Sequence, residues 1–358
     1  MESVHKAVLL HEVVGSLVSD TDFFHEGITY PSTKRPCKLG NETKESMREV
    51  RGLWQASSRD MLCPHEKNPA NNIWYLDGTL GGCGHALAIV KALEARNVPI
   101  SIIGLDRDKI AIERAEKTFK ELKEKRTNIG KVILECENYR NVDKVLEKHG
   151  IREMNMILLD LGFSSDELER SGRGFSFQKD EPLLMTMGET VVYPFTAKDI
   201  LNRWTEEDIA NVIFGYGEER FARRIARTIC EYRKKKLIET SGELCEIVRN
   251  SVPIFYRRGK IHPATKTFQA LRIAVNDELG SLKEGIMKGY AHLAKGGKMA
   301  VISFHSLEDS IVKNFFKEKA KADGATITKK PIVAGTQEVA ENPRSRSAKL
   351  RIIEKSFE

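Results

Sequence analysis

The sequence predicts an α/β fold built on a doubly wound parallel sheet, and two observations carry this prediction. Three apolar, strand-like runs each end in an aspartate: Ile73–Asp77, Ser101–Asp106 and Met156–Asp160. Helical patterns with apolar residues spaced i, i+3, i+4 and i+7 follow the first two runs, at 86–93 and 112–122. Alternating strands and helices are typical of parallel sheets, because each crossover between parallel strands needs a connecting helix.

A glycine-rich loop, Gly78–His85, directly follows the first run. Parallel α/β sheets bind nucleotide-like ligands at the carboxyl ends of their strands, and glycines let the backbone approach a ligand closely. A dinucleotide fingerprint starting at Gly82 requires glycine or alanine where Leu87 stands, and the Gly-Lys-Ser/Thr of a phosphate loop is absent. The loop therefore favours S-adenosylmethionine as ligand, with an ordinary strand–helix turn as the alternative.

Further candidate contacts stand at or near the ends of the other strands. Asp106 can accept hydrogen bonds from ribose hydroxyls, a role that serves NAD and S-adenosylmethionine equally. Tyr139 follows a further strand at 131–136 and either stacks on adenine or packs in the core. Asp160 begins a segment where an acceptor would meet a methyl donor. Asp108 is predicted instead to cap the helix that starts at Lys109.

The remaining elements divide the chain into four predicted parts. The N-terminal helix occupies 1–19, a polar, loop-like insertion 20–72, the α/β domain 73–164 and 263–358, and a helical insert 165–262. Within these parts we predict helices at 196–203, 205–214, 217–234 and 240–250, a long helix from about 264, a second helix to Leu293, a Gly296-Gly297 turn, a loop at 321–340, a strand at 299–304, and a last strand at 350–354 that pairs antiparallel with it.

Composition narrows the class of protein. The chain has 358 residues, 41% of them hydrophobic, and a net charge of +7, which is compatible with a polyanionic partner. The six cysteines are scattered and predict reduced thiols, and no metal site is expected. We expect no membrane span and no signal or transit peptide at the start of the sequence.

Nine segments together resemble the S-adenosylmethionine-dependent small-subunit rRNA (cytidine-N(4)-)methyltransferase family of bacteria, including its organellar relatives, the methyltransferase-like 15 proteins. The segments run in family order along the chain, except across about 20–70. They are 5–13, 77–85, 105–108, 158–165, 173–177, 216–220, 262–273, 302–309 and 342–351.

The resemblance implies a Rossmann-like class I methyltransferase sheet, a donor site, and rRNA or an assembling small subunit as partner. It implies that Cys83, Gly84 and His85 line the methionine part of the donor, beside Asp77, and that Asp106 holds the ribose. It further implies Tyr139 on the adenine side, with Asp160 and Glu167 completing the site.

The acceptor side follows from the expected chemistry, the formation of N(4)-methylcytidine. The lone pair of cytosine's amine is delocalised, and hydrogen-bond acceptors on its hydrogens can turn the nitrogen toward tetrahedral geometry. We predict Asp160 as this catalytic acceptor. Phe163 stacks on the base or packs in the core. His262, His305 and Glu308 face the cleft or serve as local hydrogen bonders. Arg344 and Arg346, with Lys349 and Arg351, form a basic tail for phosphates, with a plain surface as the alternative.

Departures from the family pattern keep two other functions open. Cys83 replaces a glycine, Glu167 a glutamine, and Leu184, Thr186 and Gly188 replace two acids and an arginine. One alternative is a non-catalytic ribosome-assembly factor that retains the fold; the other is a nicotinamide dehydrogenase, which Leu87 disfavours. The insertion favours a mitochondrial location, with a cytoplasmic one as the alternative.

Overall fold

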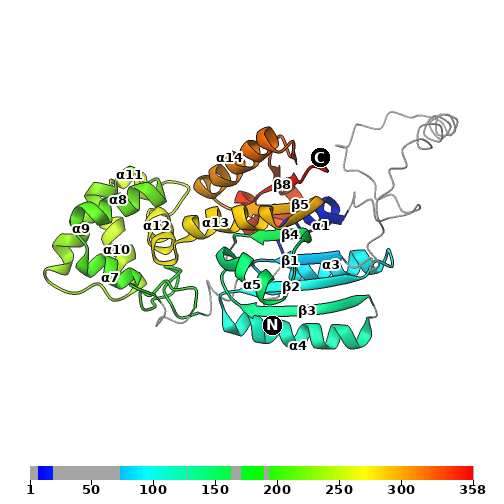
Figure 1. The fold of residues 1–358 in the computed structure, drawn as a ribbon. Coiled ribbons are helices and arrows are strands. Elements are labelled where there is room, and N and C mark those ends of the chain that lie inside the picture. Colours follow the sequence, from blue (N-terminus) through cyan, green and yellow to red (C-terminus); the bar gives the residue numbers. More distant parts are fainter. Residues whose placement is uncertain (1–6, 19–72, 127, 163–170, 189–192, 358) are drawn as a thin grey trace, which may run out of the picture. The chain divides into compact units, whose positions relative to one another are not determined.

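The computed structural model describes residues 7–18, 73–126, 128–162, 171–188 and 193–357 (Figure 1). The predictions made for 20–72, Phe163 and Glu167 lie outside the described residues. Among the described residues, no helix is both long enough and apolar enough to cross a membrane.

An eight-stranded sheet organises the described chain, in the order β3-β2-β1-β4-β5-β8-β6, with β7 paired to β8. Strands β1 to β5 are parallel, and β8 runs antiparallel to β5, with Val301 opposite Arg351. The predicted antiparallel last strand is therefore confirmed. The strands are β1 Ile73–Asp77, β2 Ile100–Asp106, β3 Ile129–Cys136, β4 Met154–Asp160, β5 Leu293–Ser303, β6 Thr326–Ile327, β7 Ile332–Val333 and β8 Lys349–Glu354.

Helices cover the sheet and bury its apolar side chains. On one face, Leu146, Ile286 and Phe316 from three helices pack on strand residues such as Leu76 and Ile157. The predicted cap is confirmed, because Asp108 Oδ1 accepts a hydrogen bond from the Ile110 amide at 3.0 Å. The helices of this part are α1 Leu10–Val18, α3 Gly84–Glu94, α4 Lys109–Lys125, α5 Val142–Lys148, α13 Glu278–Ala291 and α14 Ser306–Ala322.

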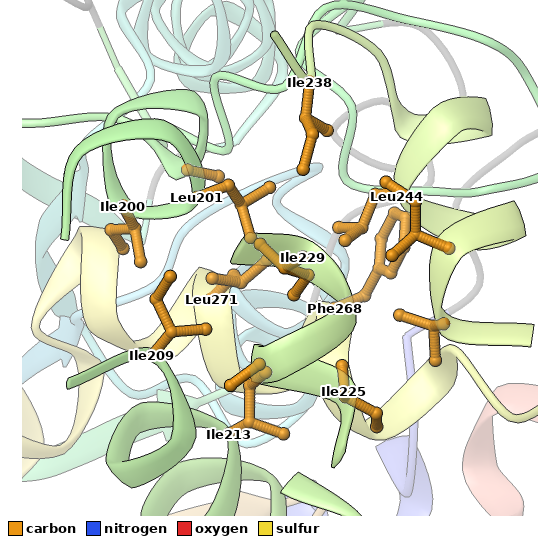
Figure 2. Close-up of a cluster of buried hydrophobic side chains, with 14 of the residues drawn as sticks. Ile200, Leu201, Ile209, Ile213, Ile225, Ile229, Ile238, Leu244, Phe268 and Leu271 are labelled. Atoms are coloured by element: carbon orange, nitrogen blue, oxygen red, sulfur yellow. The ribbon is translucent and has the colours of Figure 1, made fainter. Parts of the chain in front are cut away.

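A second hydrophobic cluster joins the helices between β4 and β5. Figure 2 shows Ile213, Ile225 and Ile229 pointing toward Phe268 and Leu271. The last two residues belong to α12, which therefore packs with the helices that precede it in sequence. The helices are α7 Ala197–Arg203, α8 Glu206–Gly217, α9 Ala222–Arg233, α10 Ser241–Ser251, α11 Ile254–Arg257 and α12 Thr265–Asn276.

Three local predictions differ from the structure. The helix predicted from 264 ends at Asn276, because Asp277 has a left-handed backbone (φ 46°) and α13 starts after it. Strand β5 begins at Leu293, before the predicted Gly296-Gly297 turn. The segment 321–340, predicted as a loop, holds β6, β7 and the start of α15 Thr336–Glu341; both strands are two residues long and owe their pairing to β8.

Candidate functional site

A cavity of about 830 Å³ lies at the carboxyl ends of β1, β2, β4 and β5. The glycine loop, the ends of β2 and β4, and helix α12 line it, together with the chain after β5 and the 3₁₀ turn Pro343–Ser347. Eight of the residues predicted as site residues are among its lining residues: Gly84, His85, Asp106, Tyr139, Asp160, His305, Arg344 and Arg346. Strand ends that are distant in sequence thus meet in one hollow, as expected for a parallel sheet.

Asp106 ties the glycine loop to the end of β2. Its two carboxylate oxygens accept backbone hydrogen bonds from Gly81 at 2.8 Å and from Asp108 at 2.9 Å. Burial raises the pKa of this carboxyl from its ordinary value. Since a carboxylate oxygen has two lone pairs, each oxygen can accept a second hydrogen bond from a ligand hydroxyl in the cavity.

Asp77 is buried and is not among the lining residues of the cavity. The Tyr75 hydroxyl donates to its Oδ2 at 2.9 Å, and the Thr79 amide donates to its Oδ1 at 3.2 Å. Burial raises the pKa of this carboxyl to about 6. The placement gives Asp77 a role in holding the glycine loop and does not support the predicted direct contact with a ligand.

The raised pKa predicts a pH-dependent contribution of Asp77 to stability. The folded protein binds this proton more tightly than the unfolded chain, so the contribution is full below about pH 4 and is lost as the pH rises through about 6. We expect Asp77→Asn, which cannot ionise, to raise the free energy of unfolding by about 2–3 kcal/mol more at neutral pH than at acid pH. Urea unfolding at both pH values measures this difference. Asp108→Asn is the control, and an equal pH dependence in Asp77→Asn and the wild type would refute the assignment.

Cys83 precedes helix α3 in a left-handed conformation, with φ 61° and ψ 10°. A side chain in this region costs about 1–2 kcal/mol, which explains why a glycine suits the position. Burial raises the pKa of the thiol to about 12, with Asp77 and Asp106 adding to the rise, so the sulfur stays protonated at neutral pH. Cys83 is buried and does not line the cavity; the backbone of Gly84 beside it does.

His85 and Asp160 both line the cavity and lie close to each other. His85 Nε2 lies 2.9 Å from the Val8 carbonyl oxygen, and its Nδ1 lies 3.7 Å from Asp160 Oδ2. The Asp160 amide donates to Thr79 Oγ1 at 2.7 Å, and Asp160 Oδ1 accepts from the Gly162 amide at 3.2 Å. The carboxylate predicted to be catalytic is therefore held by its own loop and by the glycine loop.

Tyr139 lines the cavity and also packs against α13. A Cβ added at Gly285 would lie 2.4 Å from its ring, so the glycine is what admits the tyrosine there. Burial raises the pKa of the phenol, with Glu308 and Glu278 adding to the rise. Both roles predicted for Tyr139, ligand contact and packing, are thus compatible with its position.

His305 and Glu308, both predicted to face the cleft, line the cavity, and Arg272 and Glu278, which no motif predicted, line it as well. Glu278 accepts two hydrogen bonds from Arg272, each 2.8 Å long. One carboxylate oxygen of Glu278, one of Glu308 and one ring nitrogen of His305 all lie within 4.8 Å of one another. The Glu308 amide donates to His305 Nδ1 at 3.5 Å, and His305 Nε2 lies 3.1 Å from Glu308 Oε1. Glu278 is thus paired with Arg272, whereas the buried His305 Nε2 has no hydrogen-bond partner among the described residues. The spacing of His305 and Glu308 is that of a capping box, whereas no spacing in the sequence signals that Glu278 joins them.

The residues of the predicted basic tail have different environments. Arg344 and Arg346 line the cavity. Arg351 is buried instead, and its Nε lies 2.6 Å from Asp309 Oδ1, while Lys349 lies 3.2 Å from Asp309 Oδ2. The prediction of Arg351 as a phosphate contact is wrong, because β8 turns this side chain toward α14. His262 is exposed and stacks on Phe177, a lining residue, with ring centroids 4.4 Å apart.

The chain is similar to known proteins over most of its length. The model of the MraW methylase family matches residues 2–356. The ribosomal RNA small subunit methyltransferase H of Persephonella marina is 47% identical over 79% of this chain and 92% of its own length. The protein of the same name from Acetivibrio thermocellus is 45% identical over 78% and 92%. A solved rRNA methylase from Streptococcus thermophilus, 10% identical over 80% of this chain and 89% of its own, has a TM-score of 0.35, too low to support a shared function.

Proposed function

The chain belongs to the MraW methylase family, and from this premise we propose that it transfers a methyl group from S-adenosylmethionine to a cytidine amine of small-subunit rRNA. The family match over residues 2–356 carries the proposal. The cavity supports it, because a strand-end carboxylate, a glycine loop and Asp160 all line the same space.

The donor is assigned to the side of the cavity formed by the ends of β1 and β2 and by Tyr139, which follows β3. Asp106 holds the ribose hydroxyls with the lone pairs that Gly81 and Asp108 leave free. The backbone at Gly84 lies against the methionine part, and the ring of Tyr139 against the adenine. Glu167, the remaining predicted contact, lies outside the described residues.

Asp160 has the central chemical role in this proposal. S-adenosylmethionine supplies an electrophilic methyl group when it is bound. The Asp160 carboxylate accepts a hydrogen bond from the cytidine amine, so that the nitrogen lone pair becomes available for attack on the methyl group. No strong base is needed, since the methylated amine loses its proton readily. The protein contributes mainly position and orientation, which are worth about 7–11 kcal/mol in well-oriented reactions.

A test of the donor site follows from Asp106. We expect Asp106→Ala to weaken binding of S-adenosylhomocysteine about 10–150-fold, since a hydrogen bond to a charged group contributes about 1.5–3 kcal/mol. Isothermal titration calorimetry measures the affinity, and thermal melting checks the fold. Asp108→Asn keeps its helix cap and serves as the matched control. Unchanged affinity in Asp106→Ala would remove Asp106 from the donor site.

The family match favours the enzyme over the non-catalytic assembly factor and over the dehydrogenase.

Two of the residues that depart from the family pattern, Thr186 and Gly188, lie in closely packed surroundings. Thr186 is fully buried, so an arginine there would bury a charge. A Cβ at Gly188 would lie 3.2 Å from the Arg107 carbonyl oxygen. Restoring the family's charges at these positions would therefore disturb packing and would not test activity cleanly.

Methylation of isolated small-subunit rRNA tests the proposed reaction directly. Nucleoside mass spectrometry should detect N(4)-methylcytidine after incubation with protein and S-adenosylmethionine, and its absence would contradict the proposal.

The relatives compared above are bacterial, so the predicted mitochondrial location finds no support and the cytoplasmic alternative is the one they favour.

A further inference from the structure

An exposed segment of the helical region combines apolar and basic side chains. Ile254, Phe255 and Ile261 are 65%, 67% and 60% exposed. The stretch 254–262 also contains Arg257, Arg258 and Lys260 and has no acidic residue. Exposed apolar side chains gathered in this way mark interaction sites, and the positive charge selects a negatively charged partner.

Arg220 packs onto the aromatic rings of this segment. Its guanidinium carbon lies 5.7 Å from the ring centroid of Phe255, 5.1 Å from that of Tyr256 and 4.8 Å from that of Phe221. Within the described part of the chain Arg220 forms no ion pair, so its charge is available to a ligand. The Tyr256 hydroxyl donates to Glu219 at 2.5 Å, which anchors the segment to the chain before α9.

The same segment leads into the cavity. His262, at its end, stacks on Phe177 at 4.4 Å with the rings inclined by 23°, and Phe177 lines the cavity. Helix α12 begins at Thr265, and both Thr265 and Gln269 are lining residues. A ligand whose reacting group occupies the cavity can therefore extend over His262 toward Phe255.

We propose that Arg220, Phe255, Arg258, Lys260 and Ile261, called here the Arg220 surface, bind unpaired rRNA nucleotides next to the target cytidine. The proposal rests on the proposed function and names how its substrate is held. Unpaired bases stack on exposed aromatic and guanidinium planes, while basic side chains neutralise the phosphates. The strand must be unpaired here, because a base reaches an enclosed pocket only after leaving its stack.

Fluorescence anisotropy with a labelled, unstructured RNA oligonucleotide of about ten nucleotides tests the surface. We expect Phe255→Ala to weaken binding about 5–150-fold, the loss typical of one stacked base. Phe255→Trp should retain binding, since it keeps a stacking plane. Met287→Ala, which removes a 53% exposed apolar side chain from α13, is the matched control and should bind as the wild type does.

Salt dependence provides a second measurement. We expect Arg220→Ala to reduce the slope of log affinity against log salt by about 0.7, the value for one phosphate contact on a single strand. Phe255→Ala should leave that slope unchanged. A slope that Arg220→Ala does not alter would overturn the phosphate contact.

The outcomes separate this proposal from the function on which it rests. Wild-type RNA affinity in Phe255→Ala, together with normal methyl transfer, would overturn the Arg220 surface alone. Weaker binding of Phe255→Ala to assembled small subunits, with unchanged affinity for the oligonucleotide, would assign the surface to a protein partner and also overturn it. A wild-type protein that binds S-adenosylhomocysteine but neither binds nor methylates rRNA would overturn both proposals.

Discussion

Asp160→Asn is expected to reduce the rate of methyl transfer about 10²–10³-fold, the usual cost of losing one aligned polar group at a reacting centre. The amide oxygen of asparagine can still accept the hydrogen bond that Gly162 donates to Oδ1. The amide NH₂ would replace Oδ2, which lies near His85 Nδ1, and can donate where the carboxylate accepted. The fold of the loop should therefore survive while the acceptor for the cytidine amine is lost.

Single-turnover methylation at saturating S-adenosylmethionine measures this effect without a contribution from donor affinity. Binding of S-adenosylhomocysteine, measured separately, shows how far Asp160 also holds the donor. Asp108→Asn, which removes the carboxylate that caps α4 after β2, should methylate at the wild-type rate. If Asp160→Asn also transfers the methyl group at that rate, Asp160 is not the catalytic acceptor.

Asp309→Ala is expected to lower the free energy of unfolding by about 3–5 kcal/mol, because it leaves a buried charge without its partner. Asp309 joins α14 to β8 through Arg351, at 2.6 Å, and Lys349, at 3.2 Å. Burial alone would raise the pKa of Asp309, but the hydrogen bonds and charges of Arg351 and Lys349 hold it below its ordinary value. Its contribution to stability is therefore present above about pH 4 and is lost as the pH falls through the lowered pKa.

Urea unfolding at neutral pH measures the loss. Asp323→Ala removes a more exposed aspartate that lies 3.4 Å from Lys319 and should change stability by less than about 1 kcal/mol. The double variant Asp309→Leu/Arg351→Met, which removes both charges, should recover part of the stability. A loss in Asp309→Ala no larger than in Asp323→Ala would show that the ion pair does not secure β8.

Local patterns were sufficient for the framework of the fold. The alternation of apolar runs and amphipathic segments predicted the parallel strands, and the polar residue before Lys109 predicted a helix cap that Asp108 indeed forms. Both signals involve only a few neighbouring residues and can therefore be recognised in the sequence. The antiparallel pairing of the last strand with 299–304 was also predicted, and β8 pairs with β5 in this way.

Part of the cavity wall depends on contacts between residues that are distant in the sequence. Glu308 lies beside His305 through the local capping box of α14, but Glu278 starts a different helix, and only packing between distant parts of the chain brings it to them. Arg351 stands in a basic stretch whose charge suggests a surface, yet the register of β8 directs it to Asp309, 42 residues away in sequence.

The sequence by itself thus determined the order of strands and helices, the acids at the strand ends and the family. The tertiary structure alone decided which polar groups share a cavity and which are paired inside the protein. The physical reason is that hydrogen-bond periodicity and capping are local, whereas burial of a charge is decided by the segments that pack around it.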